Sequence, residues 1–226
     1  MTSLTYGVMF KAEMVRAYMA GVKTQTRRLK GLDEINQMPD SWKFSGWMWK
    51  DHRATACFQS ADSILKVKSP YGFDQDTIWI KETYGVICKV ADPLCWCETD
   101  EEIRENHYVE YRADTGNPYP GEWPAEEAKG NDEAPKWRSA MFMPHKSSRF
   151  TDIPILNVRV ERLHDITVAD AFAEGVRTNY LNQRPDWIDK QSYAELWDKI
   201  NGKTYPWSDN PWVFVYEFPK YQKEQS

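Results

Sequence analysis

The segment from Gly21 to Arg28 holds the densest set of polar side chains that could bind or transform a ligand. Its sequence, G-V-K-T-Q-T-R-R, brings one lysine, two threonines and two arginines together. Alternate side chains of an extended chain share a face, so Thr26 and Arg28 fall on one face and Gln25 and Arg27 on the other. Cationic and hydroxyl groups at this spacing suit an anion or the polar edge of a ring. A solvated edge strand is the alternative interpretation of the same residues.

Glu82 is a carboxylate at the end of an otherwise apolar stripe. In the predicted strand Thr77–Tyr84 it shares a face with two isoleucines, because alternate residues of a strand point the same way. Pairing with Lys23 or Arg28 would place Glu82 in the same ligand site, where it could tune the lysine. A structural ion pair is the alternative interpretation.

A second basic segment runs from His145 to Arg149, with the sequence H-K-S-S-R. Together with Arg27 and Arg28 it could supply a local positive patch. Ser148 and Arg149 are then expected to contact the ligand, with the guanidinium of Arg149 on a phosphate. A solvated loop with incidental charge is the alternative.

The overall charge excludes a broad surface for nucleic acid. The 226 residues include 29 Lys and Arg against 34 Asp and Glu, a formal net charge of -5. Binding to long nucleic acids depends on neutralising many phosphates, so any such contact must come from a local patch. Mean hydropathy is -0.72, and no run approaches the roughly 18 apolar residues that suggest a membrane span. We therefore expect no membrane partner.

Aromatic residues make up 14% of the chain and include 11 tryptophans. Such side chains bury a large area and also stack on flat ligands. Periodic spacing predicts core positions for Trp197, Trp212, Phe214 and Phe218, whereas Trp79 is ambiguous. For the remaining candidates, packing is the main expectation and stacking on an unpaired base is the alternative. These candidates are Trp42, Trp47, Trp49, Trp123 and Trp137.

The periodic segments predict an α+β fold. Helices are expected at Lys11–Ala20, from Thr167 to Gly175 and from Ser192 to Gly202, from apolar spacing and capping residues. Strands are expected at Lys23–Leu29, Thr77–Tyr84, Ile153–Val160 and Trp212–Phe218. Residues 31–69 are expected to be irregular apart from a hairpin around Trp47–Trp49, and Gly116–Lys136 to form a long exposed loop. A β-barrel with helices on its outside is the arrangement we expect.

Cys88, Cys95 and Cys97 lie near His107 in the sequence, but C-x-C spacing is poor for structural zinc. We therefore expect free thiols, with no metal and no other cofactor. The sequence carries no glycine-rich phosphate loop and no local signature of a catalytic triad. No signal peptide is visible, so a cytoplasmic location is expected.

The pattern G-x-K-x-x-T-x-R, formed by Gly21, Lys23, Thr26 and Arg28, resembles the signature of the ASCH domain family. That family usually has Glu where Thr26 stands, but its small bacterial members that hydrolyse acetylated cytidine have Thr there. Further segments resemble a larger phage and prophage branch, in order along nearly the whole chain. They are Asp76–Thr83, Tyr111–Asp114, Trp137–Arg149, Val158–Thr167, Ala173–Val176, Leu196–Gly202 and Asn210–Phe218. One departure is Gln75, where a Gly-Asp pair usually precedes the strand.

The resemblance implies a PUA-like β-barrel with flanking helices and a cleft beside the signature. It implies one domain over residues 1–226, with insertions at about 31–69 and 115–136, and a function linked to RNA or modified nucleosides. By matching the amidohydrolase members, it makes Lys23 the catalytic base or nucleophile, Thr26 the residue that orients water or the amide oxygen, and Glu174 the proton shuttle.

Three classes of function stay open on the sequence. The first is an enzyme that hydrolyses an acyl amide on a cytidine-like base or, as a second choice, cleaves RNA. The second is a reader that binds a modified nucleotide in the same cleft without turnover. The third is a phage accessory protein that acts through contacts with another protein, for which the acidic balance is the only hint.

Overall fold

The computed structural model describes residues 3–50, 53–88, 107–114, 136–176 and 187–222. The chain divides into two compact units. The first unit comprises Met1–Tyr6, Ala17–Ile78 and Asp152–Ser226, and the second comprises Gly7–Arg16 and Trp79–Thr151. The mixed α+β class is confirmed, and the prediction of one domain over the whole chain stays a prediction. Trp123, Cys95, Cys97 and nearly all of the predicted loop Gly116–Lys136 lie outside the described residues.

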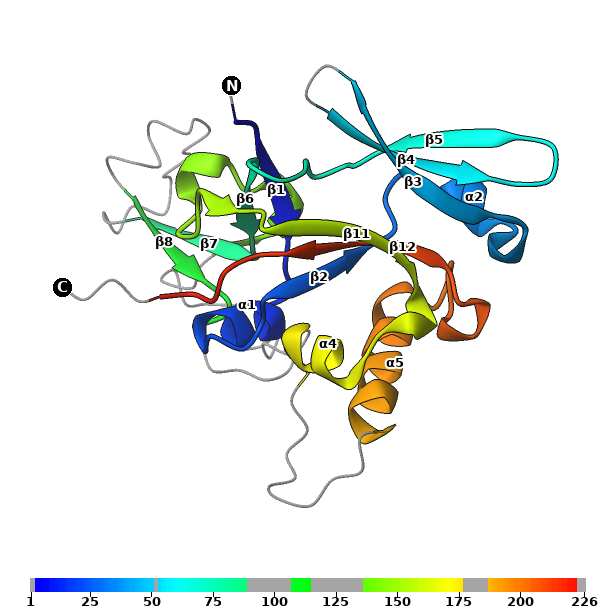
Figure 1. The fold of residues 1–226 in the computed structure, drawn as a ribbon. Coiled ribbons are helices and arrows are strands. Elements are labelled where there is room, and N and C mark those ends of the chain that lie inside the picture. The colour runs from blue at the N-terminus through cyan, green and yellow to red at the C-terminus, as the bar shows by residue number, and fades with distance from the viewer. Residues whose placement is uncertain (1–2, 51–52, 89–106, 115–135, 177–186, 223–226) are drawn as a thin grey trace. The chain divides into compact units, whose positions relative to one another are not determined.

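The described structure contains more strand than helix, and the strands are short (Figure 1). The strands are β1 (Thr5–Met9), β2 (Gln25–Arg28), β3 (Lys43–Lys50), β4 (Arg53–Gln59), β5 (Ile64–Lys68), β6 (Thr77–Lys81), β7 (Tyr84–Cys88), β8 (His107–Tyr111), β9 (Lys136–Arg138), β10 (Ile153–Pro154), β11 (Asn157–Arg162) and β12 (Trp212–Glu217). The α-helices are α1 (Ala12–Met19), α2 (Asp33–Asn36), α4 (Val168–Ala173) and α5 (Trp187–Asn201). Short 3-10 turns occur at Pro39–Ser41, Ala140–Phe142, His145–Ser147, Leu163–Asp165 and Trp207–Asp209.

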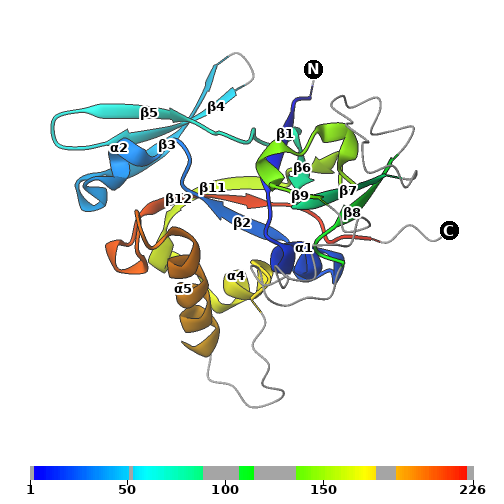
Figure 2. The same cartoon turned by 180° about the vertical axis from the view of Figure 1, so that it is seen from behind.

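The sheet that organises the first unit has the order β11-β12-β2, with β12 antiparallel to both neighbours. Val215 of β12 is the partner of Arg27 on one side and of Arg159 on the other. Helices α4 and α5 lie on the same side of this sheet in Figures 1 and 2. Val213 and Val215 pack with Tyr193 of α5 in one buried cluster. The charged row Arg27 and Arg159 therefore shares a face with the apolar core under the helices.

Residues 31–69 are more regular than the sequence predicts. The hairpin that contains Trp47–Trp49 is confirmed, because β3 pairs with β4. The rest of the prediction is wrong, since β5 adds a third antiparallel strand and α2 forms before the sheet. Strand β4 has the sequence R-A-T-A-C-F-Q. Its short side chains give little periodic signal, so pairing with its neighbours rather than intrinsic propensity decides its conformation.

Two predicted strands are each divided by the tertiary structure. The segment predicted as Thr77–Tyr84 ends its first strand at Lys81, and β7 begins at Tyr84. The segment predicted as Ile153–Val160 is divided between β10, which pairs with β6, and β11, which pairs with β12. The sequence pattern does not reveal where one strand ends and the next begins, because apolar residues between the strands are also buried. Ile155, between β10 and β11, is an example.

The sequence predicts the ends of α4 and α5 well, but it misplaces the beginning of α5. Helix α4 begins after Thr167 and is followed by Gly175, and α5 ends at Asn201 before Gly202, as expected. The prediction that the last helix begins at Ser192 is wrong, because α5 already begins at Trp187. The intervening sequence, W-I-D-K-Q, contains neither glycine nor proline, so nothing in it interrupts a helix.

The aromatic residues divide much as the spacing predicts. Trp197, Phe214 and Phe218 are buried, whereas Trp212 is half-buried. Trp49 is 58% exposed and is therefore free to contact another molecule with part of its ring. Among the described residues, no helix combines the length and the apolar character needed to cross a membrane.

Thr167 caps α4 and so positions Glu174, the residue that directly follows the helix. Its hydroxyl accepts a bond from the backbone of Asp170 at 3.0 Å, and the Asp170 carboxylate accepts one from the backbone of Thr167 at 3.0 Å. We expect Thr167→Ala to lower the free energy of unfolding by about 1 kcal/mol, since an orphan backbone donor then loses its acceptor. Urea unfolding measures the change. Thr167→Ser is the matched control that retains the cap, and equal stability of the two variants would contradict the assignment.

Candidate functional site

The segment before β2 is fastened to two helices by its backbone. The amides of Val22 and Lys23 both donate to the carbonyl of Ala17 at the end of α1, at 3.0 and 3.1 Å. One residue later, the amide of Thr24 donates to the carbonyl of Ala173, the last residue of α4, at 2.8 Å. These bonds bring Lys23 beside the end of α4, where Glu174 follows.

Lys23 is completely buried, with no exposed surface. Its Nζ donates to the Glu174 carboxylate at 2.8 Å, to the Glu174 carbonyl at 2.9 Å and to the Gln25 carbonyl at 2.7 Å. These three acceptors match the three donors of an ammonium group. Burial lowers the pKa of Lys23 below its ordinary value, and the positive charges of Arg28 and Arg27 act in the same direction against the attraction of Glu174.

Glu174 is shared between two buried cations. One carboxylate oxygen accepts from Lys23, and the other accepts from Nη1 of Arg27 at 3.0 Å. Arg27 also donates to Glu161 at 2.6 Å and lies over the ring of Tyr193, 5.8 Å from its centroid. Burial opposes the charge of Arg27, but the nearby carboxylates outweigh it and raise the pKa of the guanidinium. Glu174 is therefore held in one orientation by two fixed partners.

Arg159 extends this ion-pair network toward the surface. It binds Glu161 at 2.8 Å, Asp170 at 2.9 Å and the carboxylate of Glu217. Among the described residues the network then holds three cations and four carboxylates, so each cation has at least one carboxylate partner. Burial opposes ionisation of Asp170, but bonds from Thr167 prevail and lower its pKa to about 2.

Gly175 permits the close approach of α4 to Lys23. Its φ is +91°, a conformation that a residue with a side chain adopts at a cost. A Cβ atom there would also lie 2.7 Å from the Cβ of Ala17 and 3.3 Å from that of Lys23. The contact between Lys23 and Glu174 thus depends on a position where a side chain does not fit.

The structure brings Lys23 and Glu174 together but places Thr26 elsewhere. Thr26 is buried and is the strand partner of Tyr216. Because side chains alternate along β2, Thr26 and Arg28 lie on the face opposite Arg27. Of the three residues expected to be catalytic, two therefore form one contact and the third faces the other side of the sheet.

The second unit contains its own buried ion pair. Arg149 binds both oxygens of Glu82 at 2.9 Å and donates to Asp114 at 2.7 Å. Its guanidinium also lies over the ring of Tyr111, at 4.2 Å, and near that of Phe150, at 5.0 Å. Burial raises the pKa of Glu82, whose exposed fraction is only 1%, although Arg149 acts against that shift.

This geometry matches the structural interpretation of Glu82, with Arg149 as its partner. Ser148 also binds the protein itself, because the carbonyls of Ile80, at 2.8 Å, and Phe150, at 3.1 Å, share the one proton of its hydroxyl. The ligand contacts expected of Ser148 and Arg149 remain predictions. Both side chains would have to exchange a bond within the protein for one to a ligand.

Sequence reasoning missed most partners in the two networks. In the first unit these are Glu161, Arg159, Asp170 and Tyr193, and in the second they are Asp114 and Tyr111. The alternation in V-R-V-E-R was an available signal, because it places Arg159 and Glu161 on one face of a strand whose partner strand is apolar. No local sequence pattern indicates which of these residues pair with residues that are distant in the sequence.

The described residues offer no arrangement of three or more His, Cys, Asp and Glu side chains suited to a metal ion. The side chain of Cys88, like Cys95 and Cys97, falls outside what the structure describes. Comparison with protein-family models, curated proteins and solved structures finds no match to this chain.

The lowered pKa of Lys23 predicts a specific dependence of stability on pH. In the unfolded chain the lysine has its ordinary pKa, near 10.5, so unfolding takes up a proton at any pH between the two values. The contribution of Lys23 to the free energy of unfolding must then rise with pH across this window. We expect the difference in stability between the wild type and Lys23→Met to shift in favour of the wild type from neutral pH toward 10.5. Urea unfolding at a series of pH values measures it, and a constant difference would show that the pKa is unshifted.

The pair of Arg149 and Glu82 is open to a double-mutant cycle. We expect Arg149→Met to lower the free energy of unfolding by about 3 kcal/mol, because it leaves a buried carboxylate without its main partner. Adding Glu82→Leu should restore most of that loss, since it removes the stranded charge. Thermal and urea unfolding of the two single variants and the double variant provide the data. An additive double variant would refute the structural pairing.

Proposed function

We propose that this chain is an ASCH-like protein with a PUA-like β-barrel that hydrolyses the acyl amide of an acetylated cytidine-like base, free or in RNA. One observation carries the proposal. The resemblance selects Lys23 and Glu174, which lie 151 positions apart, and their side chains form a buried ion pair at 2.8 Å. This contact supports the roles that the resemblance implies, because a base and the group that carries its proton must lie within hydrogen-bond reach of each other.

The pair has the proton chemistry that amide hydrolysis needs. A neutral Lys23 keeps two N–H donors and gains a lone pair. To take a proton from water, the amine exchanges one of the three protein oxygens around it for that water. The resulting hydroxide attacks the acyl carbon and forms a C–O bond. The C–N bond then breaks, and the proton passes from Lys23 through Glu174 to the leaving exocyclic amine, giving the free base and acetic acid, which ionises to acetate.

Arg27 is a positioning residue in this scheme. Its bond to Glu174 fixes the carboxylate that would carry the proton, and its own partner Glu161 holds the guanidinium in place. Thr26 and Arg28 have no step in this scheme, because both side chains face the opposite side of β2. The contact of Arg28 with the nucleotide, expected from the sequence, stays a prediction.

A reader of modified nucleotides is the second candidate function. It is favoured by the complete burial of Lys23 and by the three acceptors that satisfy its Nζ. A lysine with three protein acceptors can hold the surrounding backbone and Glu174 in place without taking part in proton transfer. The two candidates share a ligand class and differ in turnover.

Incubation with acetylated cytidine tests the enzymatic proposal. We expect release of cytidine and acetate, measured by chromatography, and a loss of at least about 100-fold in kcat/KM for Lys23→Met and for Glu174→Gln, since each removes a proton-transfer group. Lys199→Ala, which changes an exposed lysine of α5, is the control expected to retain full activity.

The same preparation separates the candidates. Saturable binding of acetylated cytidine or of RNA that contains it, without product, would replace the hydrolase with the reader. Neither binding nor turnover would contradict both. Turnover that survives in Lys23→Met would remove Lys23 from the mechanism.

A further inference from the structure

The first unit contains a cavity of about 260 Å³ that lies apart from Lys23 and Glu174. It is partly open to solvent and is bounded by the beginnings of β1 and β4, by the end of β5 and by the turn that precedes β6. The lining residues are Leu4, Thr5, Tyr6, Arg53, Ala54, Lys68, Ser69, Gly72, Phe73 and Asp76. The volume is close to the lower end of the roughly 300–1,000 Å³ typical of small-molecule sites. It suits one compact ligand.

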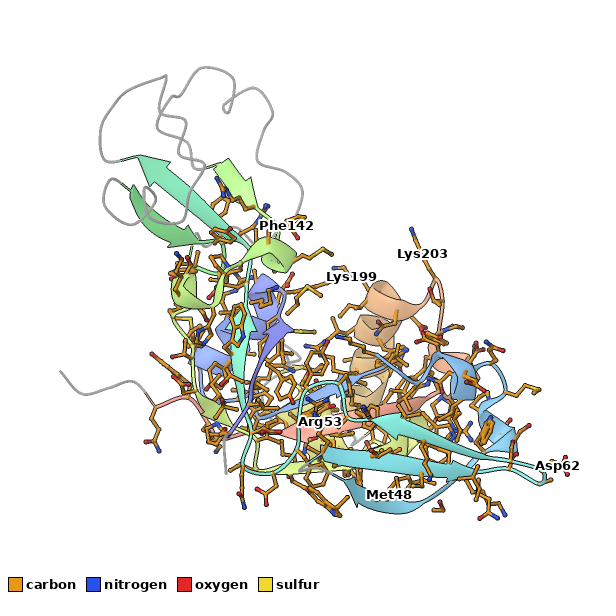
Figure 3. All side chains as sticks on the ribbon, turned by 90° about the horizontal axis from the view of Figure 1, so that it is seen from above. Met48, Arg53, Asp62, Phe142, Lys199 and Lys203 are labelled. Carbon is orange, nitrogen blue, oxygen red and sulfur yellow. The ribbon has the colours of Figure 1, made fainter. Side chains whose placement is uncertain are left out.

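Two cationic side chains, Arg53 and Lys68, line this cavity. Arg53, labelled in Figure 3, is the first residue of β4, and Lys68 is the last residue of β5. Both side chains are exposed, and within the described part of the chain neither has an ion-pair or hydrogen-bond partner. Exposed cations that are not neutralised by the protein are available to a ligand with negative charge. Arg53 can bind a phosphate with two parallel bonds, and Lys68 can add a point charge.

An aromatic wall stands beside these cations. Phe73 lines the cavity and is held edge-to-face by Trp47, at a centroid distance of 4.8 Å, and by Trp49, at 4.6 Å. The two tryptophans fix the ring of Phe73, and Trp49 is itself 58% exposed. Tyr6 contributes a second ring to the lining. Flat heterocycles stack on such rings, at about 1–3 kcal/mol per base.

The one carboxylate of the cavity is occupied by the backbone. Asp76 accepts bonds from the amide of Leu4 at 2.9 Å and from that of Phe73 at 3.0 Å, so it closes the turn. Gly72 lets the turn fold this tightly, because its φ is +83° and a Cβ there would lie 2.6 Å from both Tyr6 and Asp76. Two cations against one engaged carboxylate leave the lining net positive, and a single carboxylate does not suit a divalent cation.

We propose that this cavity is a nucleotide site that takes one nucleoside monophosphate unit, with its phosphate on Arg53 and Lys68 and its base against Phe73. The unit could be a free nucleotide or one position of a single strand, since both present the same phosphate and ring. The site goes beyond the proposed hydrolysis, because it recognises a phosphate and uses none of the residues of the Lys23 network.

Isothermal titration of the full chain at low salt tests the site. The probes are adenosine monophosphate, adenosine and a short 5′-phosphorylated single-stranded oligonucleotide. We expect saturable binding of the monophosphate and at least about tenfold weaker binding of adenosine, because only the phosphate reaches the two cations. Binding of the oligonucleotide alone would identify a strand as the source of the unit. No saturable binding of either phosphorylated probe, or equal binding of adenosine, would overturn the proposal.

Variants link the binding to the cavity. Arg53→Ala and Lys68→Ala should each weaken binding about tenfold, and Phe73→Leu should weaken it by a similar factor through lost stacking. Lys66→Ala, two positions away on β5, is the matched control and should bind like the wild type. Wild-type affinity in both cation variants would overturn the assignment. Lys23→Met should retain nucleotide binding, so failure of this site and failure of the proposed hydrolysis are separately visible.

Discussion

The burial of two positive charges, those of Lys23 and Arg27, is the constraint on which the first unit depends. A buried ammonium or guanidinium loses its hydration and must recover that free energy from carboxylates and carbonyls. Glu174 serves both cations, so the end of α4 has to lie against β2. Gly175 makes that approach sterically feasible. The charges can therefore pair only when the helix α4 lies in this position on the sheet.

The same constraint connects stability with the proposed chemistry. Burial lowers the pKa of Lys23. The charged form of this lysine is therefore less favourable in the folded protein than in the unfolded chain. A proton acceptor in amide hydrolysis needs this property, because only the neutral amine can take a proton from water. Arg27 also donates to Glu174, so this carboxylate has a second cationic partner besides Lys23.

The excess of tryptophan has two physical explanations in this fold. Trp197 lies in the core under the helices, where a large ring contributes much buried area. Trp47 and Trp49 belong to the sheet β3-β4-β5 and brace Phe73 at the edge of the cavity. Residues 31–69, which the sequence predicts to be irregular, thus carry the two tryptophans that contact Phe73 and also the two exposed cations Arg53 and Lys68.

The sequence alone determined local features of the chain. It defined the cap at Thr167, the helix end at Gly175 and the alternation of β2, and the resemblance selected Lys23 and Glu174. Tertiary structure alone decided which charges meet. The bonds of Arg27 reach Glu161 and Glu174 across 134 and 147 positions. Short-range spacing fixes backbone conformation and the face that a side chain occupies. The partner on that face depends on how distant strands and helices fold back, and burial arises only when they do.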